Sequence, residues 1–298
     1  MAQEREGQER QDQRQVRIEK IQALRDAGVL PYADRFDWTN TLAEARAIAA
    51  AQASDEPGDG TDVRVAGRVM TMRRFGKLLF LHLQDGSGRC QVVLDEQTIG
   101  AESMELFSRV VDLADHVGFA GRTGRTKKGE PSVWAASWTF LSKALRPLPE
   151  KWHGLTDAEA RQRARYLDLV SNPETRERFR FRTRFVREIR RYLDEHGFEE
   201  VDTPVLQTKA SGALARPFFT HHNAMDMQCV LRIAPETWLK QCVAGGIDRV
   251  YEVARCFRNE GMDPSHLQDF TMVEWYAAYW SYEENMAFNE ALILHVLD

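Results

Sequence analysis

Two neighbouring segments near residue 260 combine side chains that could bind a nucleotide together with an amino compound. Residues 255–261 read Arg-Cys-Phe-Arg-Asn-Glu-Gly, and residues 266–276 read His-Leu-Gln-Asp-Phe-Thr-Met-Val-Glu-Trp-Tyr. The planar guanidinium of an arginine suits phosphate or carboxylate oxygens, an aromatic ring can stack on a base, and a carboxylate can hold an ammonium group. The alternative is a strand pair whose arginine and glutamate simply neutralise each other.

A pair of strands must position these side chains. We expect residues 251–257 and 270–276 to form antiparallel strands, with the intervening polar residues at or near the hairpin. Since alternate residues of a strand share a face, four residues of the second strand can address one side of the sheet. These four are Phe270, Met272, Glu274 and Tyr276. The residues expected at or near the hairpin are Arg258, Glu260 and His266.

The preceding residues predict the rest of an α+β domain. Asn172 and Pro173 are typical of a helix start and Gly197 of a helix end. Between them, apolar residues at helical spacing predict one buried face. These are Phe181, Phe185, Ile189, Tyr192 and Leu193. Short strands are expected at Glu199–Leu206, Cys229–Ile233 and Arg249–Val253. Strands joined by hairpins or loops, with helices to one side, favour an antiparallel α+β domain.

The N-terminal half predicts a small β-barrel. Its β-prone runs are Val63–Met72, Leu78–Leu83, Cys90–Leu94, Val117–Arg122 and Ser132–Leu141. Turn signals separate these runs, and a helix is expected between the third and the fourth, at Glu102–Ala114. This order is typical of an OB-fold, whose open face binds single-stranded nucleic acid or oligosaccharide.

Two clusters of turn residues and prolines suggest the domain boundaries. They lie at residues 54–60 and 147–149. We therefore expect a helical extension over 1–57, an OB-fold domain over 58–145 and a catalytic domain over 146–298. The extension includes a helix at Leu42–Ala53, and the dense charge of residues 3–26 favours a solvated helix or a frayed tail.

The composition is that of a folded protein without a metal or disulfide framework. Of 298 residues, 43% are hydrophobic and 29% charged. The net charge of −5 argues against indiscriminate binding of nucleic acid, although a local basic face is still possible. The four cysteines form no C-x-x-C pair. No segment suits a membrane span or a signal peptide, so we expect a cytoplasmic protein.

Phe257–Gly261 together with Phe270–Tyr276 resembles motif 2 of the class II aminoacyl-tRNA synthetases, and specifically that of lysyl-tRNA synthetases. Further segments resemble that family in the family's order. They are residues 67–89, 143–154, 165–172, 215–226 and 231–240. The resemblance covers the chain from Val63 onward. It implies an OB-fold anticodon-binding domain, a class II catalytic domain, ATP-dependent activation of lysine to lysyl-adenylate, and transfer of lysine to tRNA(Lys).

The resemblance also implies a role for each matching residue of the ATP site. Arg258 would be the catalytic residue, because it would bridge the α-phosphate of ATP and the lysine carboxylate and stabilise charge there. Glu260 and His266 would contact ATP, and Phe270 would stack on adenine.

For lysine, the resemblance implies two groups of contacts. Glu236 and the backbone of Gly212 would hold the α-amino group, whereas Glu274 and Tyr276 would hold the ε-ammonium. A desolvated carboxylate at the end of a long pocket favours an ammonium and leaves a neutral or acidic side chain unpaired or repelled.

In the barrel, Phe80 and Gln91 match the family positions that stack on and hydrogen-bond an anticodon base. The alternative for Phe80 is a place in the barrel core, since strand alternation decides which face is interior. Phe198–Pro204 resembles motif 1, which forms the homodimer interface in the family.

Two departures from the family pattern stand out. The loop at 262–269 lacks the arginine and the Asn-Pro that usually surround the histidine. The family's third motif, its magnesium-holding acidic residues and a second carboxylate for the lysine tail have no counterpart here, so we assign no metal-binding residue. We expect this chain, as a truncated synthetase, to form no lysyl-adenylate alone. The rival interpretations are a protein-lysylating paralogue, a non-catalytic RNA-binding fragment, and an aspartyl or asparaginyl enzyme.

Overall fold

The structure is a computed structural model that describes residues 2–52, 59–149, 155–263 and 265–297. It divides into two compact units, residues 1–172 and 173–298, and each is described here by itself. Most of the turn cluster at 54–60 and the end of the segment 143–154 lie outside the described residues. None of the described helices is both long and apolar enough to cross a membrane.

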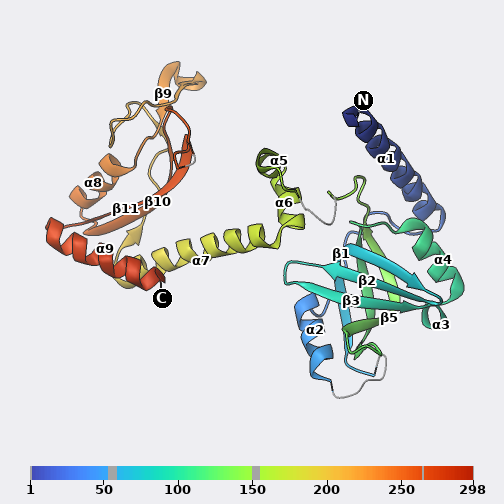
Figure 1. Ribbon diagram of the computed structural model, residues 1–298. Helices are drawn as coiled ribbons and strands as arrows, with labels where there is room; N and C mark the ends of the chain where they lie inside the picture. The colour runs from blue at the N-terminus through green and yellow to red at the C-terminus, as the bar shows by residue number, and fades with distance from the viewer. Residues whose placement is uncertain (1, 53–58, 150–154, 264, 298) are drawn as a thin grey trace. The chain divides into compact units, whose positions relative to one another are not determined.

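The first unit contains a closed five-stranded barrel, as the sequence predicted (Figure 1). Its strand order is β1-β2-β3-β5-β4. The strands are β1 (Asp62–Phe75), β2 (Leu78–Gln84), β3 (Arg89–Asp95), β4 (His116–Arg125) and β5 (Pro131–Ser142). Two helices, α3 (Glu96–Ile99) and α4 (Ala101–Val110), lie between β3 and β4 in the chain. This arrangement is the OB-fold that the order of the β-prone runs indicated.

The helix expected at Glu102–Ala114 is shorter than predicted, because α4 ends at Val110. The backbone N–H of Asp112 donates to Asp115 Oδ2 at 2.7 Å, and Ala114 has a positive φ of 82°. A tight turn closed by an aspartate side chain therefore replaces the last turn of the expected helix.

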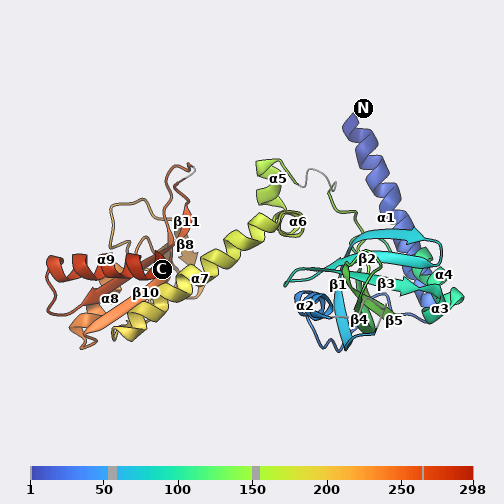
Figure 2. The same ribbon diagram turned by 60° about the horizontal axis from the view of Figure 1, so that its bottom comes forward.

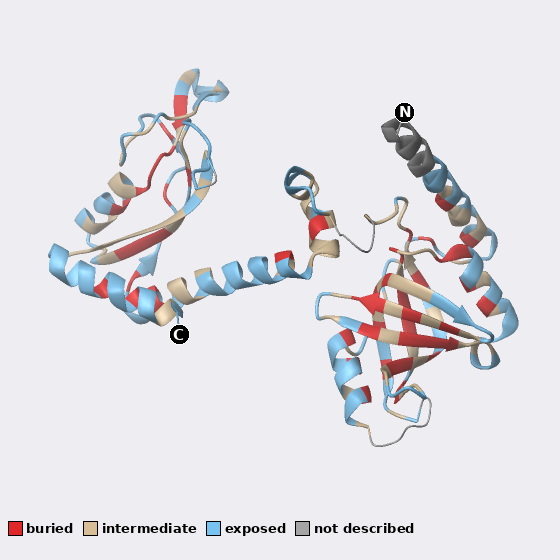
Figure 3. Cartoon of the chain, in the orientation of Figure 1, coloured by how far each residue is buried: buried red, intermediate tan, exposed pale blue. Residues whose placement is uncertain are grey.

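Strand alternation explains how the barrel closes around its core. Leu79, Leu81 and Leu83 of β2 are buried and belong to the core, whereas Phe80 and His82 between them are only partly buried. Buried residues recur along the barrel strands in this way (Figure 3). Since successive side chains of a strand point to opposite faces, Phe80 and His82 lie on the outer face of the barrel.

The N-terminal helix α1 (Ala2–Asp26) is attached to the barrel at its C-terminal half. Leu24 is fully buried in the barrel core, and Lys20 Nζ lies 2.6 Å from Asp112 Oδ1. Arg17 donates to the carbonyl of Ala144 at 2.7 Å. The C-terminal half of this helix is therefore docked on the barrel, and the expectation of a solvated helix or a frayed tail was wrong for this half.

Helix α2 (Leu42–Ala51) begins at a capping box, in which Thr41 accepts from the N–H of Glu44 and the Glu44 side chain accepts from the N–H of Thr41. It ends two residues before the predicted end at Ala53, which lies outside the described residues. Two short helices, α5 (Ala158–Arg163) and α6 (Arg165–Ser171), complete the unit.

The second unit is built on two small sheets. The first, in the order β11-β10-β6, contains β6 (Glu199–Glu200), β10 (Arg249–Phe257) and β11 (Asp269–Ala277). The second, in the order β7-β9-β8, contains β7 (Leu206–Gln207), β8 (Phe219–His222) and β9 (Met227–Leu231), with a short 3-10 helix at Asn223–Met225. The helices are α7 (Pro173–Glu195), α8 (Glu236–Ala244) and α9 (Tyr282–Leu297). Of the strand pairs described in this unit, β6 with β10 is parallel and the others are antiparallel.

Glu199–Leu206 was predicted as one strand, and this was wrong. After Glu200 the N–H of Val201 still donates to Tyr251 O, but Val205 O then accepts from Arg232 N, so the chain leaves the first sheet. Pro204, which has no N–H to donate to a ladder, lies in this crossing. The strand expected at Cys229–Ile233 is shifted to Met227–Leu231, and the one expected at Arg249–Val253 extends to Phe257.

Helix α7 ends before Gly197, which has the left-handed φ of 76° expected for a helix end. Its predicted apolar face is buried only near that end, where Tyr192 and Leu193 pack with α9 alongside (Figure 2). Phe181 and Phe185 are 60% and 41% exposed, so the prediction of one buried face was wrong for the N-terminal half of the helix.

Candidate functional site

The predicted strand pair of the second unit is observed as β10 and β11. Phe270 pairs with Cys256, Glu274 with Glu252 and Tyr276 with Val250. The alternate residues Tyr251, Val253, Val273 and Trp275 pack in the core with α7 and α9. Phe270, Glu274 and Tyr276 therefore share the opposite face, which helix α8 contacts. The helices thus lie on both sides of this sheet, and the expectation that they lie to one side was wrong.

Two carboxylates stand opposite each other on that face, but only one is compensated. Glu252 is 2% exposed, and its oxygens lie 2.5 Å from Arg232 Nη1 and 2.6 Å from Thr203 Oγ1. Glu274 has a buried Oε2 atom without any hydrogen-bond partner. Burial raises the pKa of the Glu274 carboxyl above its ordinary value of 4.5, and the negative charge of Glu236 adds to this. Among the described residues, Glu274 therefore forms no ion pair, and only the more distant charges of Arg258 and Lys240 favour its ionised form.

Arg258 follows β10 directly and lies over the ring of Phe270, with 5.1 Å between Cζ and the ring centroid. Its Nε atom is buried and has no hydrogen-bond partner, while its backbone N–H donates to Gln268 O at 2.8 Å. The charge of Arg258 acts on Glu274 and favours its ionised form. An arginine held by its backbone, with an unpaired N–H, is ready to bind an anionic group.

Glu236, at the start of α8, brings a third carboxylate to this face. The ammonium of Lys240 lies 2.5 Å from Glu236 Oε1 and 5.6 Å from the ring centroid of Tyr276. Burial raises the pKa of Tyr276, and the charge of Glu274 adds to the effect. A side-chain ammonium of the chain itself therefore occupies a place between a carboxylate and an aromatic ring.

Gly212 lies directly against the start of α8. It has a positive φ of 87°, and a Cβ atom added to it would lie 3.0 Å from the Glu236 Cβ and 3.1 Å from the Ala234 Cβ. A side chain at position 212 would be strained by the backbone conformation and crowded by α8. The close approach places the backbone of residue 212 beside the Cβ and the backbone nitrogen of Glu236.

Glu260 and His266 lie in the connection between β10 and β11. Glu260 Oε1 accepts from the backbone N–H of Arg216 at 3.3 Å. The His266 side chain is 74% exposed, and its Nδ1 lies 2.7 Å from Asp263 Oδ2. Pro264 between them lies outside the described residues. The structure thus gathers six of the predicted residues, Arg258, Phe270, Glu274, Tyr276, Glu236 and Gly212, whereas Glu260 and His266 contact other partners in the described part of the chain.

On the barrel, Phe80 and Gln91 lie on one outer face. Phe80 is partly exposed, and its ring packs in a T-shaped arrangement with the ring of Phe75, with 5.9 Å between the ring centroids. Gln91 Oε1 accepts from Ser132 Oγ at 2.8 Å, which leaves the amide nitrogen of Gln91 available to a ligand. Since Leu79 and Leu81 fill the interior, the alternative that Phe80 belongs to the barrel core was wrong.

Sequence reasoning missed two residues that the structure brings to these faces. Lys240 lies four residues after Glu236 on a helix, and oppositely charged residues at this spacing commonly form an ion pair. This spacing could have identified Lys240 as a neighbour of the site. Trp134 occupies an outer position of β5, which the alternation of buried Val133 and Ala135 could have indicated.

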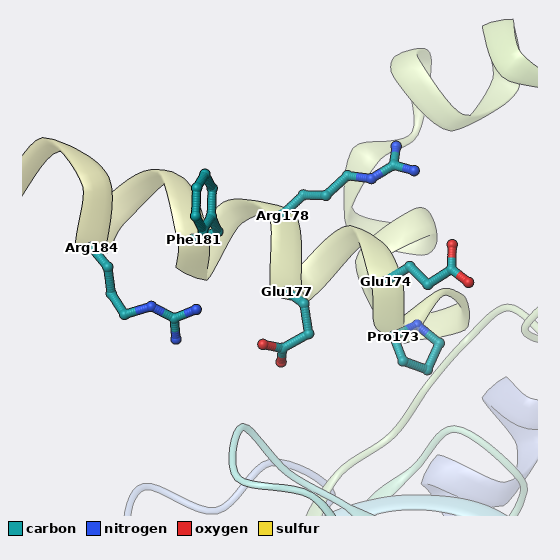
Figure 4. A pocket seen from close by; sticks show the side chains of 6 residues that line it. All are labelled: Pro173, Glu174, Glu177, Arg178, Phe181 and Arg184. Atoms are coloured by element: carbon teal, nitrogen blue, oxygen red, sulfur yellow. The ribbon is translucent and has the colours of Figure 1, made fainter. Parts of the chain in front are cut away.

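A surface hollow follows the first turns of α7 (Figure 4). It is lined by Pro173, Glu174, Glu177, Arg178, Phe181 and Arg184. Because a single helix face supplies every one of these residues, the hollow offers no converging groups for chemistry. Among the residues that the structure describes, no group of three or more His, Cys, Asp and Glu side chains could hold a metal ion.

Comparison with known proteins identifies both units. The family of class II tRNA synthetases (D, K and N) matches residues 157–298, and the OB-fold nucleic acid binding domain matches residues 63–141. A lysine–tRNA ligase from Carboxydothermus hydrogenoformans is 47% identical over 283 residues, which are 95% of this chain and 57% of that protein. A lysine–tRNA ligase from Enterococcus faecalis is 49% identical, again over 95% of this chain and 57% of that protein.

A third relative, the lysine–tRNA ligase of Latilactobacillus sakei, is 46% identical over 98% of this chain and 58% of its own length. The chain thus spans little more than half the length of these relatives. Nearly the whole of the chain matches proteins of one name, and both domains match the corresponding family models. The chain belongs to the lysine–tRNA ligase family of the class II aminoacyl-tRNA synthetases.

Proposed function

We propose that the face shared by β10, β11 and α8 belongs to a site that binds lysine and ATP for the formation of lysyl-adenylate, and that the barrel binds the anticodon of tRNA(Lys). The observation that carries the proposal is the uncompensated Glu274 carboxylate, whose Oε2 is buried without a partner. A folded protein retains such a group at a cost, which a cationic ligand would offset. The unpaired Nε of Arg258 on the same hairpin provides the complementary anion site.

For lysine, each end of the substrate has a matching group. Glu274 would hold the ε-ammonium with Tyr276 beside it, and Glu236 with the backbone of Gly212 would hold the α-amino group. The Lys240 ammonium supports this assignment, because it already sits between Glu236 and Tyr276. Lys240 must share Glu236 with the ligand, so we expect it to move toward solvent when lysine binds.

For ATP, Arg258 is the catalytic residue. It would bridge the lysine carboxylate and the α-phosphate, so that charge developing as the carboxylate oxygen attacks phosphorus is stabilised by a guanidinium held in place beforehand. Phe270 would stack on adenine, and Glu260 and His266 would contact ATP from the loop. Magnesium is implied by the family, but the described residues offer no cluster to hold it, and no step here is assigned to it.

For tRNA, Phe80 and Gln91 would stack on and hydrogen-bond an anticodon base. Exposure of the Phe80 ring supports this, because stacking on an aromatic ring contributes about 1–3 kcal/mol per base. We further propose three functional segments, with an extension over 1–57, the barrel over 58–145 and the catalytic domain over 146–298. We also propose that the protein acts in the cytoplasm.

We propose a homodimer through Phe198–Pro204 and the adjoining face of α7. Phe198 itself is 4% exposed and packs in the core of the second unit. Its exposed neighbours would therefore make the contact between the two subunits. The exposed rings of Phe181 and Phe185 and the hollow beside Phe181 support an additional partner surface on α7. Sedimentation at several concentrations tests the proposal, and a Phe181→Ser, Phe185→Ser variant should shift the protein to monomer.

Calorimetric titration tests the lysine assignment directly. Norleucine has the same four side-chain carbons as lysine but lacks the ε-ammonium, so the wild-type protein should bind L-lysine much more tightly than norleucine. Glu274→Gln should abolish this preference, while Glu290→Gln on the exposed side of α9 should leave it unchanged. Equal affinity for both ligands, or preference for L-aspartate or L-asparagine, would contradict the proposal.

A further inference from the structure

The ammonium group of Lys240 lies within the proposed lysine site. Its Nζ atom is 2.5 Å from Glu236 Oε1 and 5.6 Å from the ring centroid of Tyr276. Glu236 and Lys240 are four positions apart in α8, so they lie on the same side of this helix, which packs against the strand that carries Tyr276. An ammonium of the protein therefore contacts the carboxylate that would hold the α-amino group of the ligand.

The chain treats the two carboxylates of the lysine site differently. Glu236 has the Lys240 ammonium as a direct partner, whereas the Oε2 atom of Glu274 is buried without a hydrogen-bond partner. Lys240 acts on Glu274 only through its more distant charge. Among the described residues, the chain thus supplies an ammonium to the carboxylate proposed for the α-amino group and none to the carboxylate proposed for the ε-ammonium.

The Lys240 ammonium can leave this position at low cost. Its side chain is 58% exposed, and that of Glu236 is 33% exposed. An ion pair at this helical spacing and an exposed cation–π contact are both weak interactions. Lys143 provides the contrast, because its side chain is fully buried and its Nζ atom contacts Asp112 and Asp115. Lys143 is fixed in the fold, whereas Lys240 can turn into water while its backbone stays in place.

We propose that Lys240 is an internal competitor for the α-amino group of the substrate, which binds by replacing the Lys240 ammonium at Glu236. The inference rests on the proposed lysine site and adds a residue that regulates its affinity. Every α-amino acid carries this amino group, so the exchange lowers the affinity for all of them by a similar factor. Net binding energy then comes from the ε-ammonium, which meets Glu274 without displacing a cation of the chain.

The test is a calorimetric titration of the wild type and of Lys240→Met with three ligands. L-Lysine carries both amino groups, norleucine carries only the α-amino group, and 6-aminohexanoate carries only the amino group that corresponds to the ε-ammonium. An ion pair four residues apart on a helix and an exposed cation–π contact together correspond to a factor of about 3–10 in affinity. Lys240→Met should therefore bind lysine and norleucine more tightly by this factor and 6-aminohexanoate with unchanged affinity.

The two neutral ligands are matched to each other. Norleucine and 6-aminohexanoate both have no net charge, so their comparison separates competition at Glu236 from a general effect of removing a positive charge. The control variant is Lys209→Met, which removes the other lysine of the second unit from an exposed position after β7 and should leave the three affinities unchanged. Lys240→Arg keeps a cation four residues after Glu236 and should bind lysine within about 2-fold of the wild type.

The outcomes separate the inference from the proposed function. If Lys240→Met leaves lysine binding unchanged or weakens it, while the wild type still prefers lysine to norleucine, Lys240 is not a competitor and the lysine site stands. If 6-aminohexanoate gains as much affinity as norleucine, Lys240 does not compete specifically with the α-amino group and the inference is wrong. If the wild-type chain binds none of the three ligands, the proposed lysine site fails together with the inference.

Discussion

Glu252 and Glu274 lie directly opposite each other on β10 and β11, and the protein compensates only the first. Glu252 is paired with Arg232 and Thr203 in a buried network, whereas Glu274 keeps one buried oxygen without a partner. Like charges opposite each other in a sheet are destabilising. The pair therefore distinguishes a carboxylate that is neutralised within the fold from one for which we propose a role in binding the ligand's ammonium group.

Amide substitutions at the two positions should have opposite effects on stability. Glu252→Gln leaves the Arg232 guanidinium buried without its counter-charge, which should lower the free energy of unfolding by about 3–5 kcal/mol. Glu274→Gln removes an uncompensated carboxylate, so the ligand-free protein should be as stable as the wild type or more stable. Urea unfolding of both variants measures the difference, and a large loss of stability for Glu274→Gln would show that Glu274 is structural.

Lysine binding should depend on pH through Glu274. The pKa of this carboxyl is raised in the ligand-free protein, so part of the population is protonated at pH values above the ordinary 4.5. An ammonium ligand favours the ionised form, so binding releases a proton and the affinity should rise with pH until Glu274 is fully ionised.

Calorimetry in two buffers of different ionisation enthalpy measures the proton released on lysine binding. Glu274→Gln should bind lysine weakly, with no proton release over the same pH range. Proton release that persists in Glu274→Gln would assign the titration to another group.

The buried ammonium of Lys143 should be essential to the barrel. Its Nζ lies 2.6 Å from Asp112 Oδ2, 2.8 Å from Asp115 Oδ2 and 2.6 Å from the carbonyl of Val110, and its side chain is fully buried. Lys143→Met would leave Asp115, also fully buried, without its cation, at a cost of about 3–5 kcal/mol. Lys128→Met, in the exposed turn between β4 and β5, is the control and should change stability by less than about 0.5 kcal/mol.

The spacing of hydrophobic residues, every second residue in strands and every three to four residues in helices, predicted much of the fold but not the ion pairs. The barrel strands lie within a few residues of the predicted runs, because buried leucines and valines alternate with outer residues between clear turns. Glu199–Leu206 was misassigned because only tertiary contacts, such as Val205 O with Arg232 N, determine where the chain changes sheets. The exposure of Phe181 was missed because periodicity indicates an apolar face without saying what covers it.

The part of the site that lies on one strand could be predicted from the sequence, whereas contacts between distant segments could not. Phe270, Glu274 and Tyr276 share a face because an even number of positions, four and then two, separates them along one strand. Arg232 forms an ion pair with Glu252 and not with Glu274, and it is distant from both glutamates in sequence. The sequence alone therefore could not show which of the two carboxylates is paired. Side chains that converge from different elements leave no local signal, and the contact of Lys240 with Tyr276 depends in the same way on the packing of α8 against β11.

The stability of the barrel should fall in mild acid because of His116. Burial lowers the pKa of His116 to about 4, and the charge of Arg68 across the β1–β4 pair adds to the effect. The unfolded chain binds a proton near pH 6.5 and the folded chain does not, so the contribution of His116 is fully present above pH 6.5 and is lost as the pH falls toward 4. His116→Gln should flatten the pH dependence of unfolding in this window, and an unchanged profile would exclude His116 as its source.

The two tryptophans of β5 should lose different amounts of stability on the same substitution. Trp138→Phe breaks the hydrogen bond to Ser103 while keeping a ring against Phe107, whose centroid lies 5.1 Å away, and should cost about 1 kcal/mol. Trp134→Phe removes a buried N–H that has no partner, so it should cost less than Trp138→Phe or even stabilise the barrel. Both changes remove the same ring atoms, so the difference between their free energies of unfolding isolates the indole N–H. A greater loss for Trp134→Phe would mean that its N–H is satisfied within the folded chain.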